Sequence, residues 1–240
     1  MNYTGEHLLP GQIGHFFIVL SLVASLVATF AYFMATVSGK KILAGVPAGE
    51  QSLLGGMIKS TEEADAWKRL ARLAFFTEVI CVLGIFITLF YIISNHLFEY
   101  HYAWKHSSRS LEVKYLLACF WEGQEGSFLL WSVWHCVLGL ILIRTSKQWE
   151  APVMTVISFA QFALATMIAG IYFFNWRMGS NPFILLRDSG VFDNAPALHV
   201  DRNLLGPVRP DYMSLAFMKD GNDLNPLLQN YWMVIHPPVL

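Results

Sequence analysis

The chain has 240 residues and a formal net charge of −1, and 55% of its residues are hydrophobic while only 14% are charged. Soluble domains carry about 25% charged residues, so this composition excludes an ordinary water-soluble domain and indicates a protein that lies in membrane lipid. The near-neutral balance gives no electrostatic footprint for nucleic acid, and we expect no nucleic-acid partner.

Four apolar stretches are long enough to cross a bilayer, which takes about 20 residues. They are residues 14–37, 70–94, 125–143 and 152–174. The first exceeds a signal-peptide core of about 7–15 residues, so we expect it to be a retained helix. The sequence therefore predicts an all-α membrane protein with four transmembrane helices in residues 1–174 and irregular outer loops.

Basic residues predict the orientation of these helices. Seven Lys and Arg residues belong to the two connections on one side, between the first and second and between the third and fourth spans, and an eighth, Arg72, lies just inside the second span. None precedes the first span, and three lie between the second and third. The positive-inside rule then places both termini outside.

The connecting segments carry fewer signals. Between the first and second spans, Ser60 or Thr61 is a candidate N-terminal cap for the second long helix. Between the second and third spans, His96, His101 and His106 are spaced by five residues, which gives no shared helix face. A metal site in that loop remains an alternative. Three cysteines without zinc-type spacing are expected to be buried and unpaired: Cys81, Cys119 and Cys136.

Residues 175–240 are rich in Pro, Asn, Asp and Gly, and we expect irregular structure with short helices and no independent core. Asn225 can cap a short helix that Pro226 starts. The chain ends just after His236, Pro237 and Pro238. A proline pair suits a helix start, so we expect a fifth helix to begin there and the chain to be the first portion of a longer protein.

Two groups of residues could carry chemistry within the membrane or at its edge. Residues 121–131 (WEGQEGSFLLW) combine two carboxylates, flexible glycines and flat aromatic surface at the mouth of the third span. An interfacial aromatic belt with a capped helix start explains them equally well. Glu78 within the second span is either structural or functional. His15 and His135 are single histidines, which we interpret as hydrogen-bonded rather than as ligands.

His236 differs from the other histidines because a proline follows it directly. Pro237 disfavours helical geometry at the preceding residue, so we expect an extended backbone at His236. The imidazole would then be held rigidly at the rim of the outer leaflet. Imidazole is a common axial ligand of haem iron and also suits zinc or copper.

Four stretches in this order resemble the N-terminal part of the CcmF family, the haem lyase subunit of the bacterial cytochrome c maturation system. They are residues 11–16, 121–131, 181–183, and 223–229 with the His236-Pro237-Pro238 motif. The resemblance covers the whole chain but is loose across residues 38–68 and 184–220. One departure is Gln124, where the family often has histidine, and this weakens a ligand role at that position.

The resemblance implies that His236 is an outer-face axial ligand of a haem b iron. It also implies an enzyme that attaches haem covalently to apocytochrome c by thioether formation, active as the full-length protein and inactive as this part alone. The implied partners are a haem carrier protein, apocytochrome c and its thiol-reducing or delivery subunits, in the bacterial inner membrane. Residues expected to border haem or apocytochrome are Trp121, Glu122, Gly123, Gln124, Glu125, Gly126 and Trp131.

Two other functions fit parts of the sequence. An ion- or proton-translocating transporter subunit would use Glu78, Glu122 and Glu125 as its path, although neither broken spans nor repeated halves are evident. A partner subunit of a split haem lyase would be functional at this length.

Overall fold

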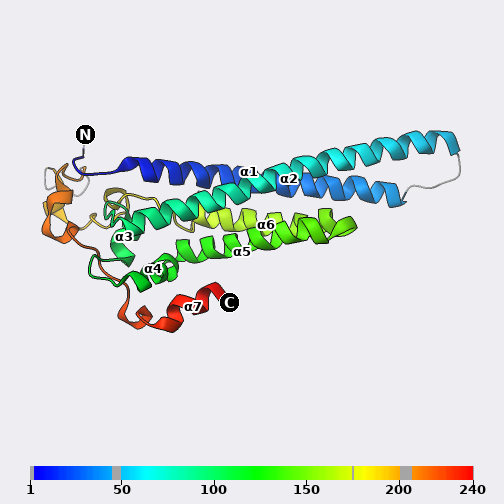
Figure 1. The fold of residues 1–240 in the computed structure, drawn as a ribbon. Coiled ribbons are helices and arrows are strands. Elements are labelled where there is room, and N and C mark those ends of the chain that lie inside the picture. Colours follow the sequence, from blue (N-terminus) through cyan, green and yellow to red (C-terminus); the bar gives the residue numbers. More distant parts are fainter. Residues whose placement is uncertain (1–2, 45–49, 175, 201–206, 240) are drawn as a thin grey trace.

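The structure, a computed structural model, describes residues 3–44, 50–174, 176–200 and 207–239, with side chains described outside residues 40–60, 172–173, 177 and 196. Most of the described chain is helical (Figure 1). The main helices are α1 (Leu8–Ala44), α2 (Glu50–Ser94), α3 (His101–His106), α4 (Leu116–Glu122), α5 (Gln124–Thr145), α6 (Glu150–Ala169) and α7 (Tyr231–Val239).

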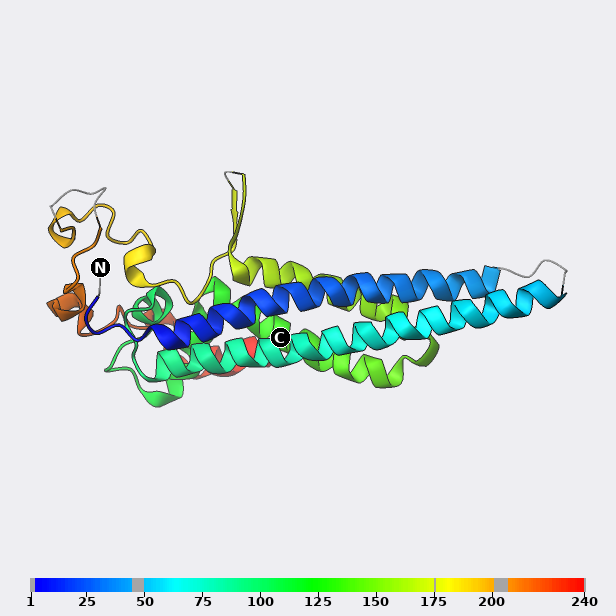
Figure 2. The ribbon, with the colours of Figure 1, turned by 90° about the horizontal axis from the view of Figure 1, so that it is seen from above.

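Four of these helices are long and apolar enough to cross a membrane: α1, α2, α5 and α6. The prediction of an all-α membrane protein with four transmembrane helices is confirmed. α1 and α2 pack along most of their length and extend past the ends of α5 and α6 (Figures 1 and 2). α2 begins at Glu50 and continues through Thr61, so the predicted helix start near Ser60 or Thr61 is wrong.

The two ends of the bundle differ in what they carry. At one end, the chain turns between α1 and α2 and between α5 and α6, and we call this the far end. The other end, which we call the site end, carries α3, α4, the start of α7 and the segments around residues 95–115, 179–200 and 207–230 (Figure 1). The candidate binding residues belong to α4, α5 and α7, apart from Gly123, which lies between α4 and α5.

An ion pair between a partly exposed arginine and a buried carboxylate fixes α2 to α6 towards the far end. The Arg72 guanidinium donates from Nε and Nη2 to the two carboxylate oxygens of Glu150, at 2.7 and 2.6 Å. The Glu150 carboxylate is almost fully buried, and a paired, bidentate arginine offsets the cost of removing its charge from water. Arg72 therefore has a packing role besides its part in the positive-inside count.

α6 ends earlier than the sequence suggested. Gly170 follows it with φ +68°, the left-handed conformation that stops a helix and that glycine adopts without strain. The next residues form a short antiparallel hairpin of β1 (Ile171–Phe173) and β2 (Trp176–Met178). This hairpin projects from the side of the bundle (Figure 2). The predicted helical extension of the fourth span to Phe174 is therefore wrong by five residues.

The long segment after α6 contains short 3₁₀ turns, as expected, and it contributes to a small buried cluster. Buried side chains from this segment pack on Phe98, and they are Leu186, Phe192, Val208, Tyr212 and Met218. The Tyr212 hydroxyl donates to Glu6 at 2.7 Å, and Glu6 also pairs with Arg187. The cluster is completed by Phe98 and, at its edge, by Tyr3 and Trp104 from earlier in the chain, so it is shared with those segments.

Candidate functional site

The site begins at a break between α4 and α5. Gly123 has an extended backbone, with φ −81° and ψ 155°, and it separates the two helices. The Ser127 hydroxyl donates to the Trp121 carbonyl at 2.9 Å and bridges the break. A Cβ at Gly126 would lie 1.6 Å from the Phe120 carbonyl oxygen. Glycine is required at Gly126 because the last turn of α4 packs directly on the first turn of α5.

Tyr102 from α3 fills this break. Its hydroxyl donates to the Phe120 carbonyl at 2.6 Å and accepts from the Gly123 N–H at 3.2 Å. The side chain is buried, and burial raises the pKa of Tyr102 well above its usual value. The hydroxyl therefore stays protonated and satisfies two backbone groups that the broken helix leaves unpaired. A Cβ at Gly123 would lie 2.5 Å from the Tyr102 ring.

Glu122 connects the break to the segment that leads into α7. Its Oε1 accepts from the Asn225 N–H at 3.2 Å. Its Oε2 lies 3.0 Å from Nδ1 of His106, an ion-pair distance without the geometry of a hydrogen bond. The Asn225 side chain accepts from the Leu227 N–H and caps a 3₁₀ helix that begins at Pro226. The predicted Asn225 cap is confirmed.

Trp121 makes the second connection to α7. Its Nε1–H donates to the Met233 carbonyl at 2.9 Å. In a regular helix this carbonyl would accept from the N–H of the residue four positions later, which here is Pro237 and has none. The tryptophan indole therefore supplies the donor that the proline lacks.

His236 lies inside α7 and not in an extended segment. α7 runs from Tyr231 to Val239 and includes both prolines. The Asn230 side chain accepts from the Trp232 N–H at its start. The expectation that Pro237 would force His236 out of helical geometry is wrong, since contacts with α4 stabilise a helix that the prolines weaken. His236 is exposed in the last turn.

A groove lies between α5 and α7. Its lining includes Pro237 and Pro238, the two residues that follow His236 in the sequence. Its volume is about 690 Å³, within the range of about 300–1,000 Å³ typical of ligand pockets. Most of the side chains that line it are aromatic or proline rings, and they are Trp131, Trp134, His135, Pro237, Pro238 and Val239. Nδ1 of His135 is buried without a described hydrogen-bond partner. His135, interpreted from sequence as a hydrogen-bonded residue, thus lines the same groove as the prolines.

The four stretches that carry the sequence resemblance meet in two pairs. Residues 121–131 contact the segment 223–238 through Glu122 and Trp121, as described above. In the other pair, Nδ2 of Asn181 lies 3.0 Å from Nδ1 of His15, and Gly14 faces the Phe183 ring so closely that a Cβ would lie 2.4 Å from it.

The predicted site residues divide into three groups. Trp121 and Glu122 contact α7 or the segment before it, and Trp131 lines the groove. Gly123 and Gly126 shape the helix break. Gln124 is exposed and Glu125 is half-buried, and neither is among the groove residues.

Sequence analysis missed Tyr100 and Tyr102, which hold the two pairs of stretches. The Tyr100 hydroxyl accepts from the Gly11 N–H at 2.8 Å and donates to the His7 carbonyl at 2.6 Å. Burial raises the pKa of Tyr100 to about 12. Two tyrosines separated by one residue in a polar loop were the only available signal.

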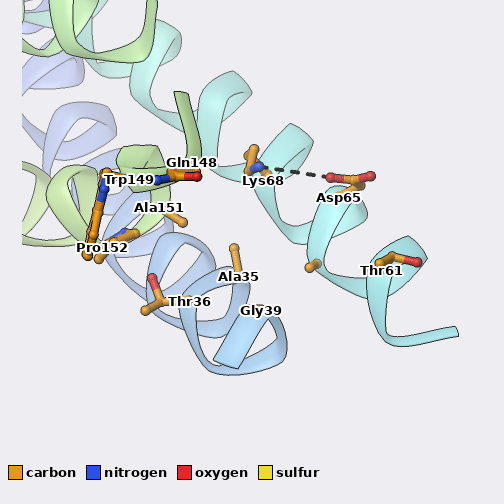
Figure 3. A pocket seen from close by; sticks show the side chains of 11 residues that line it. Ala35, Thr36, Gly39, Thr61, Asp65, Lys68, Gln148, Trp149, Ala151 and Pro152 are labelled. Atoms are coloured by element: carbon orange, nitrogen blue, oxygen red, sulfur yellow. Dashed lines mark ion pairs between the residues drawn. The ribbon is translucent and has the colours of Figure 1, made fainter. Parts of the chain in front are cut away.

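The far end has a pocket of its own, of about 610 Å³, between the ends of α1 and α2 and the start of α6 (Figure 3). Lys68 and Asp65 form an ion pair at 4.0 Å on its wall. It contains none of the predicted site residues. Within the described part of the chain, no group of three or more His, Cys, Asp or Glu side chains could hold a metal ion, so the loop histidines do not form one.

Four membrane-crossing helices with an aromatic groove beside an exposed histidine define a multi-pass membrane protein with a candidate ligand site. The chain is similar to the cytochrome c-type biogenesis protein CcmF of Haemophilus influenzae, with 26% identity over 164 residues, 65% of this chain and 19% of that protein. CcmF of Pseudomonas fluorescens is 26% identical over 178 residues, 72% of this chain and 22% of that protein.

The cytochrome c-type biogenesis protein NrfE of Haemophilus influenzae is 26% identical over 147 residues, 60% of this chain and 18% of that protein. The resemblance to the CcmF family is thereby confirmed. The chain spans about a fifth of the length of the curated relatives it matches. No known family model and no solved structure matches it.

The helix break yields a stability prediction. Gly126→Ala should lower the free energy of unfolding by about 1–3 kcal/mol, the usual cost of overpacking, because the new methyl group meets the Phe120 backbone. Thermal unfolding of the purified protein in detergent measures this. Gly39→Ala is the matched control, since a Cβ at Gly39 meets open space and alanine is the better helix former. Equal midpoints for the two variants would contradict the packing assigned to Gly126.

The Trp121 bond yields a second prediction. Trp121→Phe keeps the aromatic ring and removes the N–H that the Met233 carbonyl accepts. Loss of one hydrogen bond, worth about 1 kcal/mol, should speed amide exchange in α7 about fivefold. Mass-resolved hydrogen exchange measures this. Trp149→Phe, at the far end, should leave α7 unchanged. Equal α7 exchange in both variants would mean that Trp121 does not hold the helix.

Proposed function

We propose that this chain is the haem-holding part of a membrane haem lyase that attaches haem covalently to apocytochrome c. The observation that carries the proposal is an exposed imidazole, His236, on a helix that Trp121 bonds directly and Glu122 holds through the preceding segment, next to an aromatic groove. Its support from outside the structure is the similarity to proteins named for cytochrome c-type biogenesis. These relatives are much longer than this chain, so assigning their activity to it is part of the proposal.

The residues present fit a haem b group. A planar macrocycle needs a flat apolar surface and an axial nitrogen ligand. Trp131 and Trp134 line the groove, and the exposed His236, which is not itself a groove residue, directly precedes the groove residue Pro237 on the adjoining helix. When bound, the haem would supply vinyl groups that take the two cysteine thiols of the apocytochrome as thioethers. Trp121 bonds α7 and Glu122 bonds the segment before it, and correct orientation of two large reactants is a large rate term.

The proposal includes an orientation and partners. The site end lies on the periplasmic side of a bacterial inner membrane, as the positive-inside rule predicts. Haem arrives there from a carrier protein, and apocytochrome c arrives with its thiol-reducing or delivery subunits. The exposed face of α7 beside the groove is where both would meet.

The geometry gives less support to an ion-translocating subunit. Glu122 lies against His106 and accepts a hydrogen bond from the Asn225 backbone at the site end. Glu78 is buried within the bundle and lines a small closed cavity that contains neither Glu122 nor Glu125. Among the described residues, the three carboxylates thus share no cavity that could serve as a common path.

His236→Ala tests the central role. In the protein of natural length, we expect bound haem, followed by Soret absorbance, and the yield of covalent cytochrome c to fall to background, because the iron loses an axial ligand. His101→Ala, a change of the same residue type at the site end, should retain both. Normal haem content and cytochrome c yield in His236→Ala would exclude His236 as the ligand.

Orientation is tested by single added cysteines and a membrane-impermeant maleimide applied to intact spheroplasts. Asp211→Cys should be labelled from outside, and Lys59→Cys only after the membrane is opened. The native cysteines are buried and should contribute little background. Labelling in the reverse order would place the site end in the cytoplasm and contradict the proposed reaction there.

A further inference from the structure

A carboxyl group lies at the middle of the membrane-spanning part of α2. Glu78 is 17 residues from Thr61 and 16 residues from Ser94, the two ends of that span. The residue is 1% exposed, and its Oε2 has no hydrogen-bond partner among the described residues. An isolated carboxylate at this depth costs several kcal/mol. Glu78 therefore needs a partner charge, hydrogen bonds from its neighbours, or a proton that neutralises it.

Glu78 lines a closed cavity at the centre of the bundle. The cavity has a volume of about 10 Å³, which is about the space that one water molecule needs. All four spanning helices contribute to its wall, with Ser21 from α1, Ser132 from α5 and Gln161 from α6 among the polar residues. The remaining lining is apolar, so the polar groups at this position face one another and not solvent.

Hydrogen bonds fix the orientation of the Gln161 amide. Its Nε2 donates to the Ser132 carbonyl at 3.1 Å and to Cys136 Sγ at 3.0 Å. A carbonyl can only accept, so the amide cannot be reversed without placing two oxygens together. Oε1 is therefore turned away from Ser132, and it is buried without a described partner. The cavity thus has two unsatisfied oxygen acceptors on its wall, one from Gln161 and one from Glu78.

The surroundings offer no positive charge to pair with Glu78. None of the cavity residues is Lys, Arg or His. The titratable groups that interact electrostatically with Glu78 are the thiols of Cys81 and Cys136, and neither is a cation. A water molecule can satisfy both oxygen acceptors, but it cannot neutralise a carboxylate.

We propose that Glu78 is a protonated, uncharged carboxyl group that binds one internal water together with Gln161 and thereby forms a polar link between α2, α5 and α6. The carboxyl O–H donates to the water, and the water donates to Gln161 Oε1. This site takes one proton and one water molecule. It is independent of haem and of His236.

Proton linkage distinguishes this state from an ionised Glu78. A folded protein that keeps the proton must release it on unfolding at any pH above the ordinary range of a glutamate, about 4.3. The stability of the wild type should then fall relative to Glu78→Gln as pH rises from about 5 to about 7. The ratio of unfolded to folded protein should rise up to about tenfold per pH unit relative to that variant. Glu63→Gln, an exposed carboxylate on the same helix, should show no such trend.

Unfolding of the purified protein in detergent, followed by circular dichroism across this pH range, measures the trend. Infrared spectra of the folded protein give a second readout: a protonated-carboxyl band should persist at about pH 7, well above the ordinary glutamate range, and be absent in Glu78→Gln. A pH-independent difference between wild type and Glu78→Gln, or the absence of that band, would overturn the proposal. So would stabilisation by sodium over choline that Glu78→Gln removes, since the cavity would then hold a cation.

Discussion

The arrangement of the site end depends on the Tyr102 hydroxyl. It bonds the Phe120 carbonyl and the Gly123 N–H across the α4–α5 break. A helix broken at the membrane edge exposes backbone groups that lipid cannot satisfy, and a buried protein hydroxyl is the substitute. Once the break is fixed, Trp121 and Glu122 are presented to the segment that leads into α7. The geometry around His236 thus follows from a tyrosine more than a hundred residues away in sequence.

Tyr100 has a matching role at the start of α1, where residues 11–16 meet residues 181–183. Gly11 packs on its ring and donates to its hydroxyl, while the neighbouring Gly14 packs on Phe183. Because Tyr100 and Tyr102 stand almost adjacent in the chain, one short loop connects the start of α1 to the α4–α5 break. The glycines of both motifs then have a common physical role: each allows an aromatic ring or a backbone carbonyl to approach where a side chain would collide.

The membrane fold could be predicted because lipid requires long apolar stretches, and these are visible at residues 14–37 or 70–94 without any tertiary information. The Asn225 cap could also be predicted, because it depends only on residues that are neighbours in sequence. The helical state of His236 could not, because Pro237 disfavours it locally and a contact from Trp121 reverses the outcome. The role of Tyr102 likewise depends on partners distant in sequence, whereas the end of α6 at Gly170 is a local glycine signal that the apolar run to Phe174 outweighed.

Pro237 gives α7 an unusual status among the helices. A proline inside a helix removes one rung of the hydrogen-bond ladder, and here the vacant carbonyl at Met233 is occupied by a side chain of another helix. α7 therefore cannot complete its own backbone pairing, and docking on α4 supplies the donor for the Met233 carbonyl. Folding of the segment that bears His236 and assembly of the surface beneath it are in this sense one event. The imidazole reaches its ordered position only after the groove beside it exists.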